Sequence, residues 1–408
     1  MNRIDILTRV EGHGNVELIR KGKRVVSARL NLFESPRLFE ALLVGRRCDE
    51  VADIACRICS ICSTVHKVAA LQAVELALAV RVSPQTRLLR ELAVQGGQIE
   101  SHALQIFCLA LPDYLGVGGF PGLAAAAPAE LKLGLRIKSL GNQVQETVGG
   151  RAIHPFNLLP GGLGTVPARD RLESLAELLA AVQQEIPAVV AFIAGLTDTL
   201  PPLPSLPACA VSGGPPLFGD RLATTDGATI SAAAAIAWLN EQVEPHSNAK
   251  VSRFDGKTFF FTGPLARLNL AMPPEYANRL TGAPVSASLL ARAVELQSAV
   301  DRAMAIISQL LADGLHREAP VAVRPATGTG VSLIEAPRGV LLHSYCFDRF
   351  GICSGATIIT PTAINQAAIE SSLNTLLSAM DGAGYDLIKS SCERLVRCFD
   401  PCISCAVH

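Results

Sequence analysis

The sequence of 408 residues predicts a mainly α fold with small β hairpins, in the α+β class. Long stretches carry apolar and small residues at helical spacing, and shorter ones alternate apolar with polar residues on either side of a turn. Two Cys-x-x-Cys pairs stand far apart, Cys59 with Cys62 and Cys402 with Cys405. Two intervening residues bring both sulfurs of a pair to one side of a turn, so the pairs can converge on one metal. We therefore expect a bundle of long helices whose N- and C-terminal segments converge on a buried metal site.

Three segments predict β hairpins. Residues 15–33 alternate apolar and polar side chains around Lys21-Gly22-Lys23. A second hairpin is expected to turn at Asp255-Gly256, because Asp-Gly favours tight turns. The third has its strands near residues 339–347 and 352–360.

Helices are expected between and after these hairpins. The second helix has the clearest start, because serine suits the N-cap, here Ser83, and proline suits the first helical position, here Pro84. The glycine- and alanine-rich residues 116–128 are expected to form a loop. The expected helices span residues 64–80, 84–111, 128–147, 168–198, 284–313, 362–380 and 386–397.

The whole chain, residues 1–408, is expected to fold as one domain. Its best linker candidate is the proline-rich segment Leu200–Pro216. Since the two cysteine pairs must meet, we expect this segment to run within one cooperative unit and not to separate two domains.

The composition limits the classes of protein to consider. Apolar residues make up 49% and the mean hydropathy is +0.33, so either the interior is large or partner subunits cover part of the surface. The 36 basic and 36 acidic residues cancel, whereas a nucleic-acid-binding protein needs a basic stripe. No uninterrupted apolar run approaches the roughly 18 residues of a membrane span. We therefore expect no nucleic-acid partner and no membrane span.

The chain contains twelve cysteines. Disulfides dominate small secreted scaffolds, but this chain is large and its first residues lack the apolar stretch of a signal peptide. In the reducing cytoplasm, clustered cysteines more often bind metal or perform redox chemistry. We therefore expect a cytoplasmic protein with a thiolate-bound metal.

Spacing alone leaves three metal sites open, because thiolates are soft ligands that bind zinc, iron, nickel and copper(I). A structural zinc site with four cysteine ligands is the commonest. An iron–sulfur cluster is suggested by Cys56-x-x-Cys59-x-x-Cys62, which repeats part of a ferredoxin pattern. A catalytic nickel–iron centre is the third.

The residues around the two pairs resemble one family. The pattern R-x-C-x-x-C-x-x-x-H runs from Arg57 to His66, and D-P-C-x-x-C-x-x-H runs from Asp400 to His408. Together they resemble the large, catalytic subunit of nickel–iron hydrogenases, and further segments follow in that family's order over nearly the whole chain. These segments are Thr8–His13, Arg37–Glu40, Ser101–His102, Leu111–Asp113, His154–Pro155, Pro160–Gly162, His246–Lys250, Gly263–Arg267, Glu335–Gly339 and Pro361–Asn365.

The resemblance implies a nickel–iron centre bound by four cysteines. Cys59 and Cys402 match terminal ligands of nickel. Cys62 and Cys405 match the thiolates that bridge nickel to iron. The iron of this family carries carbon monoxide and two cyanides, which no protein residue supplies.

Other matched residues are expected to surround this centre. Pro337, Arg338 and Thr362 match the positions that hold the cyanides. His66 matches a residue beside a bridging cysteine sulfur. The alternative is that His66 lies on the first turns of a helix, makes ordinary hydrogen bonds there and has no role at the metal.

Heterolytic cleavage of dihydrogen releases a proton, and the resemblance leaves two bases open. In one route Cys402 accepts the proton and Glu11 carries it onward, because a carboxylate within hydrogen-bonding distance can relay a proton. In the other the base is Arg338, with Asp113 and Asp400 around it. An arginine has a pKa above about 12, so it is better suited to polarising the substrate.

Glu40 and His408 match a magnesium site remote from the nickel. Carboxylate and water ligands suit magnesium. The alternative is a surface glutamate beside a C-terminal histidine that binds nothing. A precursor tail is cut after this histidine in the family, so we expect the chain to represent a mature subunit.

The chain carries no Rossmann fingerprint or P-loop, and too few cysteines outside the two pairs for a relay of clusters. Electrons are therefore expected to leave through an iron–sulfur small subunit, joined by a flavin or other electron-transfer subunit. The acceptors considered are NAD(P), a deazaflavin, ferredoxin and a heterodisulfide. Two rival classes are quinone-binding relatives, which have lost the four cysteines, and a structural zinc protein, which would not need the segment Glu335–Gly339.

Overall fold

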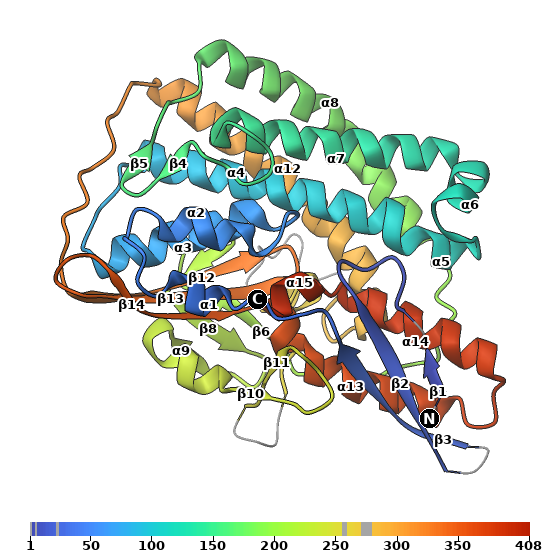
Figure 1. The fold of residues 1–408 in the computed structure, drawn as a ribbon. Helices are drawn as coiled ribbons and strands as arrows, with labels where there is room; N and C mark the ends of the chain where they lie inside the picture. The colour runs from blue at the N-terminus through green and yellow to red at the C-terminus, as the bar shows by residue number, and fades with distance from the viewer. Residues whose placement is uncertain (1, 5, 22–23, 255–258, 271–279) are drawn as a thin grey trace.

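Long helices form one side of the molecule in the computed structural model, which describes residues 2–4, 6–21, 24–254, 259–270 and 280–408. The four longest described helices pack side by side (Figure 1). They are α4 (Pro84–Ala103), α7 (Pro128–Gly149), α8 (Arg169–Ala194) and α12 (Ser288–Asp313). This confirms the expected helical bundle in an α+β fold.

The start of α4 follows from its first residues. The Ser83 hydroxyl oxygen accepts a hydrogen bond from the backbone N–H of Thr86 at 3.0 Å, and Pro84 occupies the first position, as predicted. Beyond Ala103 the chain continues through a π-helical segment, Leu104–Ala110, into α5 (Leu111–Leu115). The long expected helix is therefore present, with a π-helical insertion that the apolar pattern did not predict.

A four-stranded antiparallel sheet lies beneath the helices in the order β14–β13–β12–β7. Its strands are β7 (Phe218–Gly219), β12 (Gly328–Ala336), β13 (Gly339–Phe347) and β14 (Cys353–Ile359). Helix α3 (Ser63–Ala77) packs on β12 and β13. The approach is close at Gly330, where an added Cβ would lie 2.0 Å from the carbonyl oxygen of Ala73. Only glycine fits there.

Alternation along β13 divides its side chains between two apolar cores. Leu341 and Tyr345 belong to the main core, which faces α3. Val340 and Leu342 point to the other face and join a smaller core around Trp238. Strand β13 is therefore buried on both faces of the sheet.

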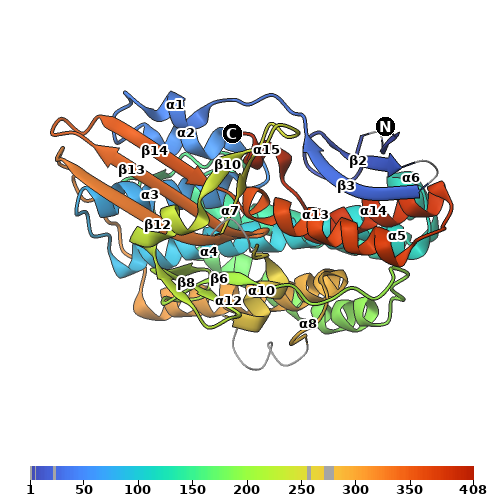
Figure 2. The same ribbon diagram turned by 90° about the horizontal axis from the view of Figure 1, so that it is seen from below.

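A second sheet is formed by β1 (Asn2–Ile4), β2 (Gly14–Lys21) and β3 (Arg24–Leu32), all antiparallel. This confirms the predicted N-terminal hairpin. Helix α13 (Pro361–Ala379) packs against β3, and α14 (Tyr385–Phe399) packs against α13. Figure 2 shows the N-terminal sheet beside these two C-terminal helices.

Shorter elements complete the described chain. The short helices are α1 (Phe39–Leu43), α2 (Val51–Ala55), α6 (Gly119–Ala126), α9 (Ala232–Leu239), α10 (Pro264–Leu270) and α15 (Ile403–Ala406), with 3-10 turns at Cys56–Ile58 and Val285–Ala287. The short strands are β4 (Leu158–Leu159), β5 (Gly162–Leu163), β6 (Cys209–Ser212), β8 (Arg221–Thr224), β9 (Thr229–Ser231), β10 (Glu241–Val243) and β11 (Lys250–Ser252).

The local structure departs from the sequence prediction at α6 and β12. Residues 116–128 are not only a loop, because their alanines form α6, in keeping with the high helix propensity of alanine. Strand β12 was not predicted, because a strand buried on both faces lacks the polar–apolar alternation that marks half-buried strands. The predicted turn at residues 255–256 lies outside the described residues; before it, β10 pairs with β11.

The C-terminus and α15 lie near the middle of the molecule, whereas the N-terminus lies at its edge (Figure 1). Residues further along the N-terminal region contact the C-terminal segment. A parallel bridge joins Glu11 to Cys402, and the N–H of Ile403 donates to the carbonyl of Glu11 at 3.0 Å. The N–H of Arg37 donates to the carbonyl of Val407 at 3.2 Å. The N-terminal region therefore holds the C-terminal segment along its length.

Helix α8 is long and apolar enough, by length and composition, to cross a membrane. Its buried residues recur every three or four positions, from Leu172 and Leu175 to Val189 and Ile193, and they face α12. Such a stripe is typical of a helix that packs on a protein core, so this one helix is weak evidence for a span.

Candidate metal centre

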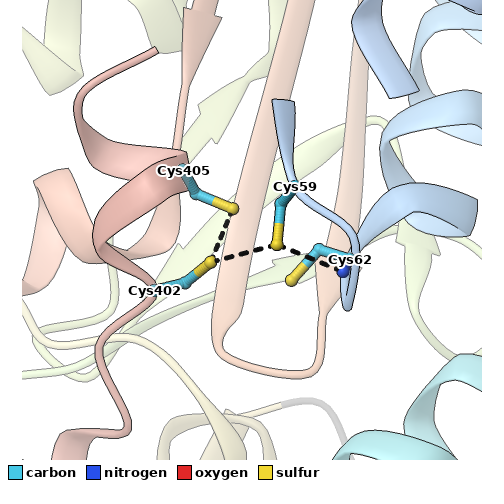
Figure 3. A group of neighbouring side chains, drawn as sticks. All are labelled: Cys59, Cys62, Cys402 and Cys405. Atoms are coloured by element: carbon cyan, nitrogen blue, oxygen red, sulfur yellow. Dashed lines mark hydrogen bonds between the residues drawn. The ribbon is translucent and has the colours of Figure 1, made fainter. Parts of the chain in front are cut away.

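Four buried cysteines gather where the N-terminal region meets the C-terminal segment (Figure 3). The sulfur atoms of Cys59, Cys62, Cys402 and Cys405 all lie within 4.8 Å of one another. The sulfur of Cys402 lies 3.4 Å from that of Cys59 and 2.8 Å from that of Cys405. All four are free thiols and not disulfides. Four sulfurs at these separations are a ligand set for a soft metal.

Turns at the start of two helices place these sulfurs. Cys62 stands at the N-cap of α3, and its N–H donates to the sulfur of Cys59 at 3.4 Å. Cys402 stands at the N-cap of α15 after Asp400, which adopts a left-handed backbone with φ 53°. Positive N-terminal ends of helices favour thiolate. The backbone therefore directs partial positive charge to both cysteine pairs.

The four thiols influence one another strongly. Hydrogen bonds with the other pair lower the pKa of Cys59 and Cys62. Burial raises the pKa of Cys402 and Cys405 well above the ordinary range. Four negative charges cannot share so small and dry a space without a compensating cation. The donor set thus fits a metal centre that would balance the charge.

Arg338 is buried against this cluster. Its Nη1 donates to the sulfur of Cys62 at 3.3 Å, and its Nε donates to the carbonyl of Asp400 at 2.9 Å. The carboxylate of Asp400 lies 3.2 Å from Nη2 of Arg338 and 3.4 Å from Arg292. Burial would lower the pKa of Arg338, but Asp400 and the thiolates raise it well above its ordinary range. The guanidinium therefore stays charged, which argues against a role as base.

Three further predicted residues lie beside the cysteines. The Glu11 carboxylate lies 3.2 Å from the sulfur of Cys402 and accepts a bond from the N–H of Ser404 at 3.0 Å. The Thr362 hydroxyl oxygen accepts from the N–H of Cys402 at 2.9 Å. Pro337 directly precedes Arg338, and its carbonyl accepts from Arg267 at 3.1 Å.

Two predicted residues occupy different positions relative to the cluster. His66, on the first turn of α3, places its Nε2 3.5 Å from the sulfur of Cys405, and burial lowers its pKa to about 4. Asp113 instead binds Arg397 at 2.7 Å and Arg9, and no described contact joins it to Arg338. Among the described residues, Asp113 therefore pairs with these two arginines and lies outside the immediate surroundings of Arg338.

The family model described as nickel-dependent hydrogenase matches residues 37–132 and 240–408, which is more than half of the chain. The chain belongs to this family. Cysteine spacing left three kinds of metal site open, and membership of this family excludes two of them, the structural zinc site and the iron–sulfur cluster. The protein is the catalytic subunit of a hydrogenase, an oxidoreductase that acts on dihydrogen, and its four-cysteine cluster fits a nickel–iron centre.

Relatives of this hydrogenase subunit cover nearly its whole length. The alpha subunit of sulfhydrogenase 2 from Pyrococcus furiosus is 36% identical, over 99% of this chain and 98% of its own. One subunit of the F420-non-reducing hydrogenase vhu from Methanococcus voltae is 31% identical, over 91% and 97%. A solved NAD+-reducing NiFe-hydrogenase in the H2-reduced state has a TM-score of 0.87 at 27% identity, covering 100% of this chain and 99% of its own. Because the relatives are named as subunits, these hydrogenases are multi-subunit complexes.

The expected magnesium ligands lie together in the hydrogenase subunit, near the C-terminus. His408 Nε2 is buried without a hydrogen-bond partner among the described residues and lies 3.9 Å from a carboxylate oxygen of Glu40. Burial raises the pKa of Glu40, but the nearby His408 imidazole and the bond from Lys250 outweigh it and hold the pKa at about 2. Glu241, 3.4 Å from Lys250, has a buried unpartnered oxygen. An unpartnered nitrogen and a charged carboxylate fit a hard cation site.

Two residues that support the centre were given no role from the sequence. Arg37 Nη2 donates to the carbonyls of Ile58 and Ser404, at 2.5 and 2.6 Å, and so ties the two cysteine pairs together. Arg292 holds Asp400 from α12. It stands on the buried face of an apolar helix, where a charged residue is rare unless it is paired. This charged residue at a buried position was the signal in the sequence that could have indicated its role.

Proposed function

We propose that Cys59 and Cys402 are terminal ligands of nickel, and that Cys62 and Cys405 bridge nickel to an iron that carries carbon monoxide and two cyanides. The convergence of four buried sulfurs from both ends of the chain is the observation that carries this proposal. When bound, the centre supplies the site at which dihydrogen is split heterolytically into a hydride and a proton.

The chain itself supplies the proton route. Cys402 is the first proton acceptor, and Glu11 takes the proton onward across the 3.2 Å between its carboxylate and the sulfur. The N–H of Ser404 holds the same carboxylate oxygen at 3.0 Å. This bond fixes the carboxylate in position, so transfer needs little side-chain movement.

Arg338 orients and polarises the substrate and does not act as the base. Asp400 fixes its guanidinium through two contacts, and Asp113 acts from a distance by holding Arg397, close to Asp400 in sequence. Pro337, Arg338 and Thr362 form the pocket for the cyanides. His66 donates a hydrogen bond to the bridging thiolate of Cys405.

Glu40 and His408 hold a magnesium ion that fastens the end of the chain. The carboxylate of Glu40 is charged at neutral pH, and the unpartnered Nε2 of His408 lies near it. Water supplies the remaining ligands, as magnesium prefers.

The catalytic subunit works as one domain, residues 1–408, in a cytoplasmic complex. Within the described residues, only one group of three or more metal-ligating side chains gathers, at the four cysteines. Electrons therefore leave through two kinds of partner, an iron–sulfur small subunit of the hydrogenase and a flavin or other electron-transfer subunit. The names of relatives support NAD+ or a non-F420 acceptor as the first to test.

Infrared spectroscopy tests the centre directly. The purified complex is examined where metal-bound carbon monoxide and cyanide absorb, and its nickel and iron are measured. Bands from both ligands, with nickel and iron both present in the complex, support the proposal. Zinc in place of nickel, with no such bands in a protein purified from cells that mature hydrogenases, contradicts it.

A further inference from the structure

A chain of hydrogen bonds leads from Cys405 into the sheet. The Cys405 sulfur lies 3.5 Å from Nε2 of His66. Nδ1 of His66 lies 3.0 Å from Nε2 of His343, and Nδ1 of His343 lies 2.6 Å from the Tyr345 hydroxyl. All four side chains are at most 2% exposed. This row of hydrogen bonds is therefore shielded from solvent along its whole length.

Two packed elements build this chain. His66 lies on α3, while His343 and Tyr345 lie two residues apart on β13 and so point to the same face of the sheet. That face packs against α3. The rings of the two histidines are 5.2 Å apart between centroids, and those of His343 and Tyr345 are 5.8 Å apart. Neither ring can turn away without disturbing the main core.

The hydrogen-bonding capacity of each group fixes which atom donates and which accepts in each of these hydrogen bonds. A metal-bound thiolate only accepts, so Nε2 of His66 carries the proton that faces Cys405. A neutral imidazole has one donor and one acceptor, so Nδ1 of His66 accepts from His343. Nδ1 of His343 must then accept from Tyr345, whose hydroxyl is the terminal donor. Each bond polarises the next, which strengthens the bond to sulfur.

We propose that His343 and Tyr345 are positioning residues that hold His66 in the tautomer whose N–H faces the Cys405 sulfur. This inference rests on the proposed role of Cys405 as a metal-bound thiolate. A hydrogen bond to a thiolate withdraws electron density from the metals that the thiolate binds. Through His66, the tyrosine hydroxyl therefore tunes the centre without touching it.

Variants of the intact complex test the tuning by infrared spectroscopy. Tyr345→Phe removes the terminal donor, so the carbon monoxide band moves to lower wavenumber while nickel and iron contents stay unchanged. His343→Leu removes the donor to His66 and gives a larger shift in the same direction. His343→Gln restores a donor and returns the band toward its wild-type position. The control Tyr114→Phe removes a hydroxyl on α5, beside Arg394, and leaves the band in place.

Neutron diffraction of the deuterated wild-type complex tests the direction itself. Deuterium is expected on Nε2 of His66, on Nε2 of His343 and on the oxygen of Tyr345. Deuterium on Nδ1 of His66 in metal-loaded protein, or wild-type bands in metal-loaded Tyr345→Phe, would overturn the inference. If the four cysteines hold zinc and no infrared bands exist, the proposed function fails. The neutron map then still decides the direction of the chain, because zinc also binds thiolate.

Discussion

Replacing Glu11 with glutamine should remove the proton-accepting group of the relay while keeping the size and the contacts of the side chain. The side-chain oxygen of glutamine can still accept from the N–H of Ser404, now 3.0 Å from the carboxylate. The same oxygen then still faces the sulfur of Cys402, 3.2 Å away. The amide cannot accept a proton, so shape and contacts are kept while the relay is lost.

The expected loss follows from what a positioned acid or base contributes. A proton-transfer residue within hydrogen-bonding distance is worth about 10²- to 10⁴-fold in rate. We therefore expect the rate of dihydrogen oxidation by Glu11→Gln, measured with an artificial dye under saturating dihydrogen, to fall by about two to four orders of magnitude. Nickel and iron contents and the infrared bands should stay close to wild type.

A matched variant controls for changes around Ser404. The carboxylate of Glu34 accepts from the hydroxyl of Ser404 at 3.1 Å, but no described contact joins it to a cysteine. Glu34→Gln should therefore keep near-wild-type turnover. The reasoning about Glu11 is refuted if Glu11→Gln, fully loaded with nickel and iron, oxidises dihydrogen as fast as the wild type.

Three further changes should act on metal content or stability. Cys59→Ala removes a terminal ligand, so nickel measured in the purified complex should fall to trace levels. Glu295→Gln removes one of two buried carboxylates that pair with Arg267, at 2.6 Å; because Glu335 still pairs with Arg267, the loss should be about 1–3 kcal/mol, seen as a lower Tm. Burial raises the pKa of Glu295, but Arg267 outweighs it and holds the pKa at about 2. This pair's stabilisation should therefore be complete above pH 4.5, the ordinary value, and be lost as the pH falls toward 2. Gly330→Ala should force α3 away from the sheet and reduce the folded yield, whereas Gly355→Ala, whose nearest atom would be 3.7 Å away, should not.

Matched control variants show whether these effects are specific to the residue that is changed. Cys392→Ala, at a buried thiol outside the cluster, should retain nickel; equal nickel loss there and in Cys59→Ala would remove the evidence for a specific ligand. Glu185→Gln breaks an exposed pair with Arg136 and should cost at most about 1 kcal/mol. A Tm for Glu295→Gln equal to that of Glu185→Gln would contradict the estimate for the buried pair.

Much of the fold could be predicted from local pattern. The helix from Ser83 onward follows from an N-cap, a proline and an apolar stripe, which act within a few residues. The N-terminal hairpin follows from alternation around a turn. The pattern failed for β12, which is covered on both faces, and for α6, whose small residues resemble a loop. For β12 the structure depends on neighbours that a local window does not contain, whereas α6 follows from the helix propensity of its alanines.

The sequence by itself determined a four-thiolate site for a soft metal, because the identity and spacing of Cys59, Cys62, Cys402 and Cys405 are properties of two short segments. Only the tertiary structure decided which groups surround the sulfurs. Arg292, from another helix, and Tyr345, two residues beyond His343 on a buried strand, reach the centre through packing. The physical reason is one of range. Ligand spacing acts within a single turn of backbone, whereas hydrogen bonds to a thiolate are set by elements that meet only when the whole chain has folded.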